Sequence, residues 1–170
     1  MIKNEDYINI IQIMDECRGN IPLFLDKIEE MECGDKAQIL LRIGASNIKK
    51  NAEMAALIEY GIQMLEDESD ASGIENVFLC ALGYEKINNY IASLSCFEKC
   101  IRQLPDSAMK CALCGMKYRV QSKKDGKLED FNLSIKAFEK AASKEKLTWR
   151  RNKWKEAWQE MIMRKEIGWK

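Results

Sequence analysis

Four of the seven cysteines have spacings that could support metal or redox chemistry. Cys96 and Cys100 are four positions apart, and Cys111 and Cys114 form a C-x-x-C sequence further along the chain. Four thiolates could coordinate a structural zinc ion, and C-x-x-C is also the spacing of thioredoxin-like redox pairs. A cysteine-based zinc or redox protein is therefore one hypothesis for this chain.

A structural interpretation accounts for the cysteines more simply. Buried cysteine behaves as a small hydrophobe, and several thiols fall where a small residue would face the interior of a predicted helix pair. The residues in such positions are Cys80, Cys100, Cys111 and Cys114. The C-x-x-C sequence would also lie within a helix, and no βαβ pattern surrounds it. We therefore expect neither a metal ion nor another cofactor.

The remaining residue types give little basis for catalysis. The sequence contains no histidine, which removes the commonest general base and the commonest metal ligand. It contains neither a GxGxxG nor a GxxxxGK[ST] phosphate-binding loop. Carboxylates stand beside lysines on predicted helix faces, as in Glu85–Lys86 and Glu98–Lys99, where a solvated surface explains them. We expect a protein that is not an enzyme.

The stretch Ile74–Ser107 predicts a helical hairpin whose interior positions carry small and aromatic residues. They are Val77, Cys80, Ala81 and Tyr84 on the first helix and Ser93, Phe97 and Cys100 on the second, with Pro105 closing the unit. Similar residues recur later at Cys111, Cys114, Gly115, Tyr118, Ser134, Phe138 and Ala141, and earlier at Gly44, Ala56 and Tyr60. The extra residues between copies fall in loops, so the spacing within helices is kept.

These units resemble the tetratricopeptide repeat, a helix–turn–helix unit of 34 residues. The resemblance implies an all-α fold, a right-handed α-solenoid of stacked antiparallel hairpins, with three repeats over residues 37–143. Two positions depart from the pattern, because Asn47 and Gln63 stand where the second repeat has Tyr84 and Cys100.

Two further elements flank the repeats in a chain that we interpret as a single domain, residues 1–170. Residues 1–34 predict a helix pair with Asn20 as a helix cap, and the chain is acidic through Asp35, with nine Asp or Glu against three Lys or Arg. Residues 146–167 predict an amphipathic helix. Its apolar face carries Trp154, Trp158, Met161 and Ile162. We expect this helix to cover the open apolar end of the solenoid.

The resemblance also implies a groove lined by the first helix of each repeat. The residues assigned to it are Gln38, Leu41, Ile48 and Lys49 in the first repeat, Phe78, Leu82, Glu85 and Lys86 in the second, and Met109, Met116, Arg119 and Val120 in the third. Seven of these are apolar, and an exposed apolar concavity usually marks a binding surface. We expect a non-enzymatic adaptor or chaperone that holds a peptide segment of a partner protein. The architecture is similar to that of type III secretion chaperones that bind translocators.

Other interpretations stay open beside this one. The groove could be filled by the chain's own N-terminal helix pair or C-terminal helix. The tryptophan-rich C-terminal helix could instead make the chain a self-associating scaffold or regulatory subunit, for example a homodimer. Basic residues on that helix could bind single-stranded nucleic acid or an anionic membrane surface. They are Arg150, Arg151, Lys153 and Lys155.

The overall charge argues against nucleic-acid and membrane partners. Lys plus Arg and Asp plus Glu both number 27, so the chain has no net charge to attract a polyanion. No run of apolar residues approaches the length of a membrane span, and the N-terminal stretch carries acidic residues unlike a secretory signal. We therefore expect a cytoplasmic protein that binds neither nucleic acid nor membrane.

Overall fold

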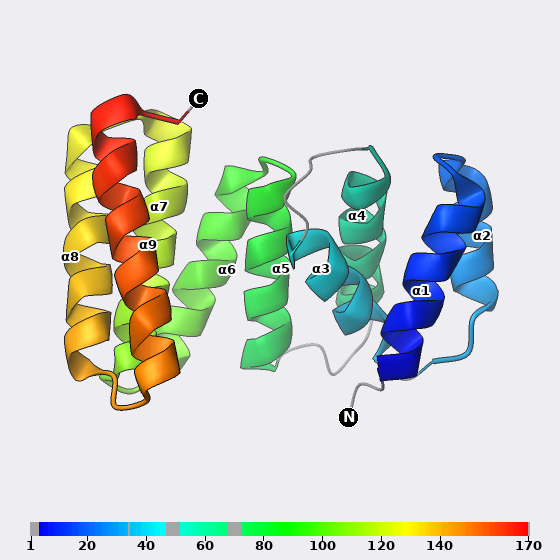
Figure 1. Cartoon of the computed structure of the whole chain (residues 1–170), viewed down its shortest axis with the longest axis horizontal. Coiled ribbons are helices and arrows are strands. Elements are labelled where there is room, and N and C mark those ends of the chain that lie inside the picture. Colours follow the sequence, from blue (N-terminus) through cyan, green and yellow to red (C-terminus); the bar gives the residue numbers. More distant parts are fainter. Residues whose placement is uncertain (1–3, 34, 47–51, 68–72, 170) are drawn as a thin grey trace. The chain divides into compact units, whose positions relative to one another are not determined.

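The computed structural model describes residues 4–33, 35–46, 52–67 and 73–169 of the chain. Within these ranges the protein has nine α-helices and no strand, which confirms the all-α prediction (Figure 1). The chain divides into two compact units, residues 1–88 and 89–170. The boundary lies inside the hairpin Ile74–Ser107, between its two helices. The interpretation of the chain as a single domain therefore stays a prediction, and each unit is described by itself.

The N-terminal unit contains five helices. They are α1 (Asn4–Cys17), α2 (Ile21–Glu30), α3 (Lys36–Ser46), α4 (Ala52–Asp67) and α5 (Ile74–Lys86). The predicted cap of α2 is present, because the Asn20 side chain accepts a hydrogen bond of 3.2 Å from the backbone N–H of Leu23. Pro22 occupies the first turn of α2, where its missing N–H costs no helical hydrogen bond. The α1–α2 pair packs against α3 and α4.

Glycines let α3, α4 and α5 approach one another closely. A Cβ atom on Gly83 of α5 would lie 2.9 Å from Ile58 of α4 and 3.1 Å from Leu41 of α3. A Cβ atom on Gly61 of α4 would lie 3.0 Å from Leu41. The 2.9 Å contact is shorter than real Cβ atoms make, and the other two are tighter than nine in ten of them, so the lack of a side chain on these glycines permits the close packing. Leu41 is enclosed as a result and has no exposed surface.

The C-terminal unit contains four helices. They are α6 (Tyr90–Gln103), α7 (Ala108–Asp125), α8 (Leu128–Lys144) and α9 (Thr148–Ile167). Helix α7 packs against both α6 and α8, and α9 packs against α8. Ser107 caps α7, because its Oγ accepts a hydrogen bond of 3.1 Å from the N–H of Lys110. Gly126 ends α7 with a φ of +65°, a conformation that favours glycine.

Helix α9 covers part of the interior of the C-terminal unit, as the spacing of its apolar residues predicted. Trp154 and Met161 are buried in one core cluster with Phe131 and Phe138 of α8. Trp158 is half-buried against the same cluster. The position of Ile162 corrects the prediction, because it is exposed and not part of the buried face. It lies about 100° around the helix from Met161, so its side chain falls outside the face of α9 that packs against the core.

Trp169, which lies two residues beyond the end of α9, packs against the C-terminal unit. Trp169 stacks on Phe131 with ring centroids 6.3 Å apart and donates a hydrogen bond of 3.0 Å from Nε1 to Oγ of Ser122. Nζ of Lys123 lies 4.7 Å from the centre of the Trp169 ring, which is within the range of a cation–π interaction. Trp169 therefore packs on α7 and α8 and does not continue α9.

Candidate interaction surfaces

The predicted groove residues of the N-terminal unit occupy different environments. Phe78, Leu82 and Lys86 on α5 are half-buried, so each keeps part of its surface in contact with solvent. Glu85 is buried. Leu41 belongs to the interior, which corrects its assignment to the groove, because Gly61 and Gly83 bring α4 and α5 over it.

Polar contacts between α3 and α5 occupy the edge of this surface. Nε2 of Gln38 donates a hydrogen bond of 2.8 Å to Oδ1 of Asn76. Arg42 forms an ion pair with Glu75 one helical turn further along α3. Gln38 therefore has a partner within its own unit. Two other predicted residues of the first repeat, Ile48 and Lys49, lie outside the described residues.

The predicted groove residues of the C-terminal unit lie on α7, beside the cluster that α9 helps to form. Met109 and Met116 are half-buried and pack against the core cluster that includes Trp154 and Met161 of α9. Arg119 is half-buried, and Val120 has no exposed surface, so Val120 belongs to the interior. Both methionines keep part of their surface exposed, because α9 packs mainly against α8.

Two of the four cysteines proposed as zinc ligands or as a redox pair, Cys100 and Cys114, are held in the thiol form. Burial raises the pKa of the Cys100 thiol to about 11 and also raises the pKa of Cys114. The thiolate is the form that binds metals and attacks disulfides, so these shifts oppose both roles. Among the described residues no group of three or more His, Cys, Asp or Glu side chains is placed to hold a metal ion. Cys111 and Cys114 lie inside α7, as the structural interpretation expects.

No family model matches the chain, and neither does any curated protein or solved structure. The function of the protein's surfaces is therefore inferred from the chemistry of their residues. Among the described residues, no helix is both long and apolar enough to cross a lipid bilayer.

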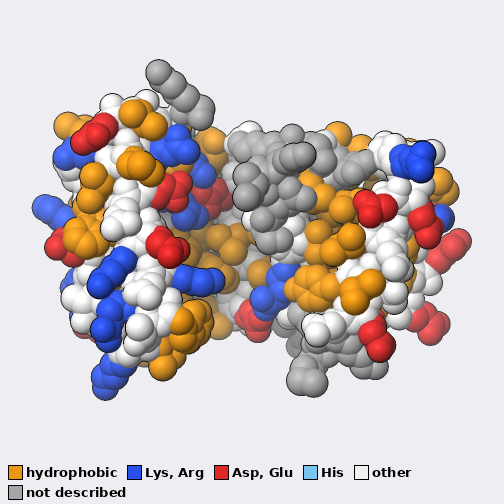
Figure 2. Space-filling model, in the orientation of Figure 1, with side chains coloured by type: hydrophobic (Ala, Val, Ile, Leu, Met, Phe, Trp, Pro, Cys, Tyr) orange, Lys and Arg blue, Asp and Glu red, His pale blue; other side chains and the backbone are white. Residues whose placement is uncertain are grey.

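The two units carry opposite charge, which the balanced total conceals. Residues 1–88 contain 17 Asp or Glu against 8 Lys or Arg, and residues 89–170 contain 10 against 19. The net charges are −9 and +9. Figure 2 shows acidic side chains predominating over α1 and α2, and basic ones over α8 and α9. This pattern was readable in the sequence, but only by counting the two halves separately.

The start of α9 presents an exposed tryptophan among cations. Trp149 is 58% exposed, and its neighbour Leu147 is exposed as well. Cζ of Arg150 lies 5.0 Å and Nζ of Lys153 lies 5.9 Å from the centre of the Trp149 ring. Lys146, also exposed, precedes Leu147. We refer to Lys146, Leu147, Trp149, Arg150 and Lys153 as the basic corner.

A buried carboxylate fixes the shape of this corner. Oε1 of Glu145 accepts a hydrogen bond of 3.1 Å from the backbone N–H of Leu147, and its Oε2 lies 3.6 Å from Nη1 of Arg150. The Leu147 N–H, followed by the charge of Arg150, holds the pKa of Glu145 below its usual value. Nε of Arg151 donates a 2.9 Å hydrogen bond to the Glu145 carbonyl oxygen. These contacts hold the turn from α8 to α9 and thereby the position of Trp149.

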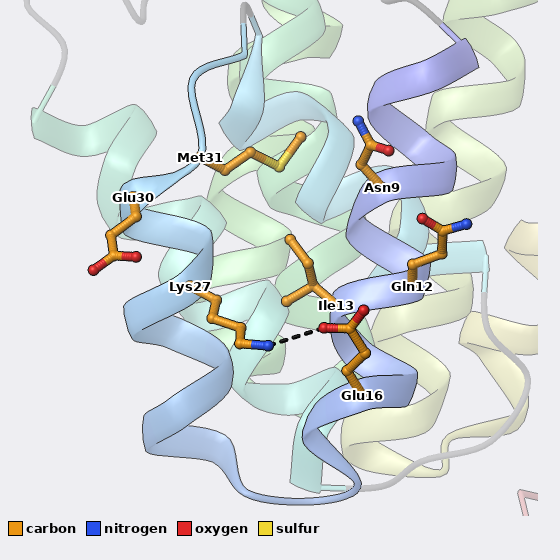
Figure 3. A pocket seen from close by; sticks show the side chains of 7 residues that line it. All are labelled: Asn9, Gln12, Ile13, Glu16, Lys27, Glu30 and Met31. Atoms are coloured by element: carbon orange, nitrogen blue, oxygen red, sulfur yellow. Dashed lines mark hydrogen bonds and ion pairs between the residues drawn. The ribbon is translucent and has the colours of Figure 1, made fainter.

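A pocket on the acidic unit lies between α1 and α2 (Figure 3). Its volume is about 390 Å³, and its lining residues are Asn9, Gln12, Ile13, Glu16, Lys27, Glu30 and Met31. The apolar side chains of Ile13 and Met31 lie between the two helices, with the two amides on the α1 side. Nζ of Lys27 pairs with Oε2 of Glu16 at 2.9 Å across one end. We refer to this hollow as the α1–α2 pocket.

Proposed function

We propose that this chain is a non-enzymatic protein-interaction module of the tetratricopeptide-like kind, which binds a peptide segment of a partner protein. The observation that carries the proposal is the partial burial of Phe78 and Leu82 on α5 and of Met116 on α7. The family pattern assigns all three to the ligand-contacting face. Each retains surface that a partner could cover, and methionine adapts its shape to different partners.

Two features of these surfaces suit a peptide better than a small molecule. Phe78 and Leu82 are one helical turn apart, so they form a stripe along α5 of the kind that an extended or helical segment can follow. Lys86 continues the stripe one turn further along α5 and is half-buried. The narrower version, a chaperone similar to those of type III secretion, depends only on the number and order of the helices.

A pull-down from the native source, with the bound proteins identified by mass spectrometry, tests the proposal. The test variant is Phe78→Gln/Leu82→Gln/Met116→Gln, and circular dichroism must show that it keeps its helical content. The control is Ile91→Gln, because Ile91 is the most exposed large apolar residue among those described and has no place in the predicted groove. One partner retained by the wild type and the control but lost by the triple variant supports the proposal. Equal retention by all three contradicts it.

A second candidate function is self-association through the C-terminal helix, and the exposure of α9 favours it. Trp149, Met163 and Ile167 are each close to 60% exposed. At 100° per residue they fall within about 40° of one another around the helix, on the side away from the buried Trp154 and Met161. Met163 and Ile167, one helical turn apart, form an exposed apolar patch that a partner could cover, and Trp149 lies about 21 Å away along the same side of the helix.

A further inference from the structure

The α1–α2 pocket is chemically suited to an apolar side chain that carries positive charge beside it. Ile13 and Met31 provide apolar surface, and the lining carries the carboxylates of Glu30 and of Glu16, the latter already paired with Lys27 of the same pocket. The α1–α2 pair as a whole is strongly acidic on its surface. Two cations, Arg18 and the partly exposed Lys27, lie between residues 4 and 30, against six exposed carboxylates: Glu5, Asp15, Glu16, Asp26, Glu29 and Glu30.

The basic corner has the complementary chemistry. Trp149 offers a large and largely exposed apolar surface, and Arg150 and Lys153 lie within 6 Å of its ring. Glu145 fixes the turn that leads into α9, on whose first turn Trp149 lies. Little backbone conformational entropy would therefore be lost when another surface covers the ring. Arg150 and Lys153 would then meet the carboxylates of the pocket rim.

We propose that the chain associates head to tail with a second copy of itself, so that the basic corner of one copy occupies the α1–α2 pocket of the next. This inference deepens the self-association candidate, on which it rests, and it does not depend on the groove. In this contact Trp149 of one copy lies in the pocket of the next copy, between Ile13 and Met31. The contact also pairs the cations beside Trp149 with Glu16 and Glu30.

The charge distribution favours a second copy over a nucleic acid. A polyanion would be attracted to the C-terminal unit at +9 but repelled by the N-terminal unit at −9. A second copy matches both units, because the acidic surface of one molecule meets the basic surface of the other. The contact area that one tryptophan and a few charges provide is small, so the association is weak and reversible.

The geometry of such a contact has a consequence that a symmetric dimer does not share. The two surfaces that meet are different, so each associated pair still has one vacant pocket and one vacant corner. Association therefore continues into longer oligomers or closes into a ring as the concentration rises. Because exposed charges are screened over about 8–10 Å near physiological ionic strength, the association weakens as salt is added.

Two variants and a control test the proposal by sedimentation velocity. The corner variant is Trp149→Ala/Lys153→Glu, and the pocket variant is Asn9→Lys/Glu30→Lys, in which both substituted residues are exposed. The control is Ile91→Ala/Lys99→Glu on α6, which removes an even more exposed apolar residue and makes the same change of charge. At low salt the wild type and the control form oligomers that grow with concentration, and each variant alone stays monomeric.

Mixing the corner variant with the pocket variant gives the decisive result. The mixture retains one intact pair of surfaces, the corner of the pocket variant and the pocket of the corner variant. It therefore forms a 1:1 heterodimer and nothing larger. Failure of the mixture to form this heterodimer overturns the proposal, and so does oligomer formation by the corner variant alone.

Further results distinguish head-to-tail association from peptide binding in the groove and from nucleic-acid binding. A wild type that stays monomeric at every concentration at low salt overturns both the head-to-tail contact and the self-association candidate. The groove variant Phe78→Gln/Leu82→Gln/Met116→Gln should oligomerise like the wild type, so loss of partner capture there is an independent result. If wild-type protein is monomeric yet binds an oligothymidine strand, and the corner variant does not, the basic corner is a nucleic-acid surface and the proposal is wrong.

Discussion

Ser134 and Gly115 are joined by a buried hydrogen bond, in which Oγ of Ser134 on α8 donates to the carbonyl oxygen of Gly115 on α7 at 2.8 Å. Directly beside this bond the ring of Phe138 lies against Gly115, so that a Cβ atom there would be 2.8 Å from three ring carbons. Three positions that the repeat pattern marks as interior therefore meet at one point between α7 and α8.

Adding one methyl group at this point should destabilise the protein. In Gly115→Ala the new Cβ forces the Phe138 ring to move, and overpacking of this kind costs about 1–3 kcal/mol, although alanine favours a helix over glycine by about 1 kcal/mol. We expect a net loss of unfolding free energy in chemical denaturation. Phe138→Leu should relieve the clash, so the double variant should lose less than the sum of the single losses. Additive losses would contradict this account of the packing.

Removing the Ser134 hydroxyl should cost about 1 kcal/mol, the usual net contribution of a buried hydrogen bond. Ser143 offers a matched control on the same helix, since its Oγ donates a 2.8 Å hydrogen bond to the Lys140 carbonyl oxygen at an exposed position. Ser143→Ala should change the unfolding free energy by less than about 0.5 kcal/mol. Equal losses in the two variants would mean that burial of the Ser134 contact is unimportant.

Replacing the buried Trp154 and the exposed Trp149 of α9 by alanine should change stability by very different amounts. Trp154→Ala should lower the free energy of unfolding by about 3–5 kcal/mol, because it leaves a cavity in the cluster with Phe131 and Phe138. Trp149→Ala should change it by about 0.5 kcal/mol or less, because Trp149 is largely exposed. Thermal or denaturant unfolding of the two variants measures the difference. A large loss from Trp149→Ala would show that Trp149 supports the fold and is not available to a partner.

The turn between α8 and α9 should lose stability in acid. The Leu147 N–H and then Arg150 lower the pKa of Glu145 from its ordinary value of 4.5, so its carboxylate stabilises the folded state. That contribution is fully present above pH 4.5 and is lost as the pH falls through the lowered pKa of the folded state. Glu145→Gln keeps an oxygen that can accept the Leu147 hydrogen bond but carries no charge. The stability difference between wild type and Glu145→Gln should therefore be constant near pH 7 and shrink below pH 4.5. A difference that does not change with pH would contradict this role.

The sequence predicted the helical interior well, because the interior depends on local spacing. Residues of fixed size at helical intervals must share a face, and the structure buries the ones that the pattern marked on α6 and α8. They are Ser93, Phe97, Cys100, Ser134, Phe138 and Ala141. The helix cap at Asn20 was equally readable, since it depends on one side chain and the helix that follows.

The candidate surfaces were predicted less well, because exposure depends on what neighbouring helices cover. Leu41 and Val120 have groove positions in the repeat pattern but are buried in the structure. For Leu41 the cause is the close approach that Gly61 and Gly83 permit, which no pattern within α3 reveals. The balanced total charge likewise concealed the opposite charges of the two units, which appear only when the unit boundary at Asn88 is known.

The most direct test of the protein-binding proposal is the affinity of the captured partner segment for purified protein. Isothermal titration should give at least a tenfold weaker dissociation constant for Phe78→Gln/Leu82→Gln/Met116→Gln than for wild type, equivalent to about 1.4 kcal/mol. The Ile91→Gln control should bind like the wild type. Equal affinities for the wild type and the triple variant would contradict the proposal that Phe78, Leu82 and Met116 contact the partner.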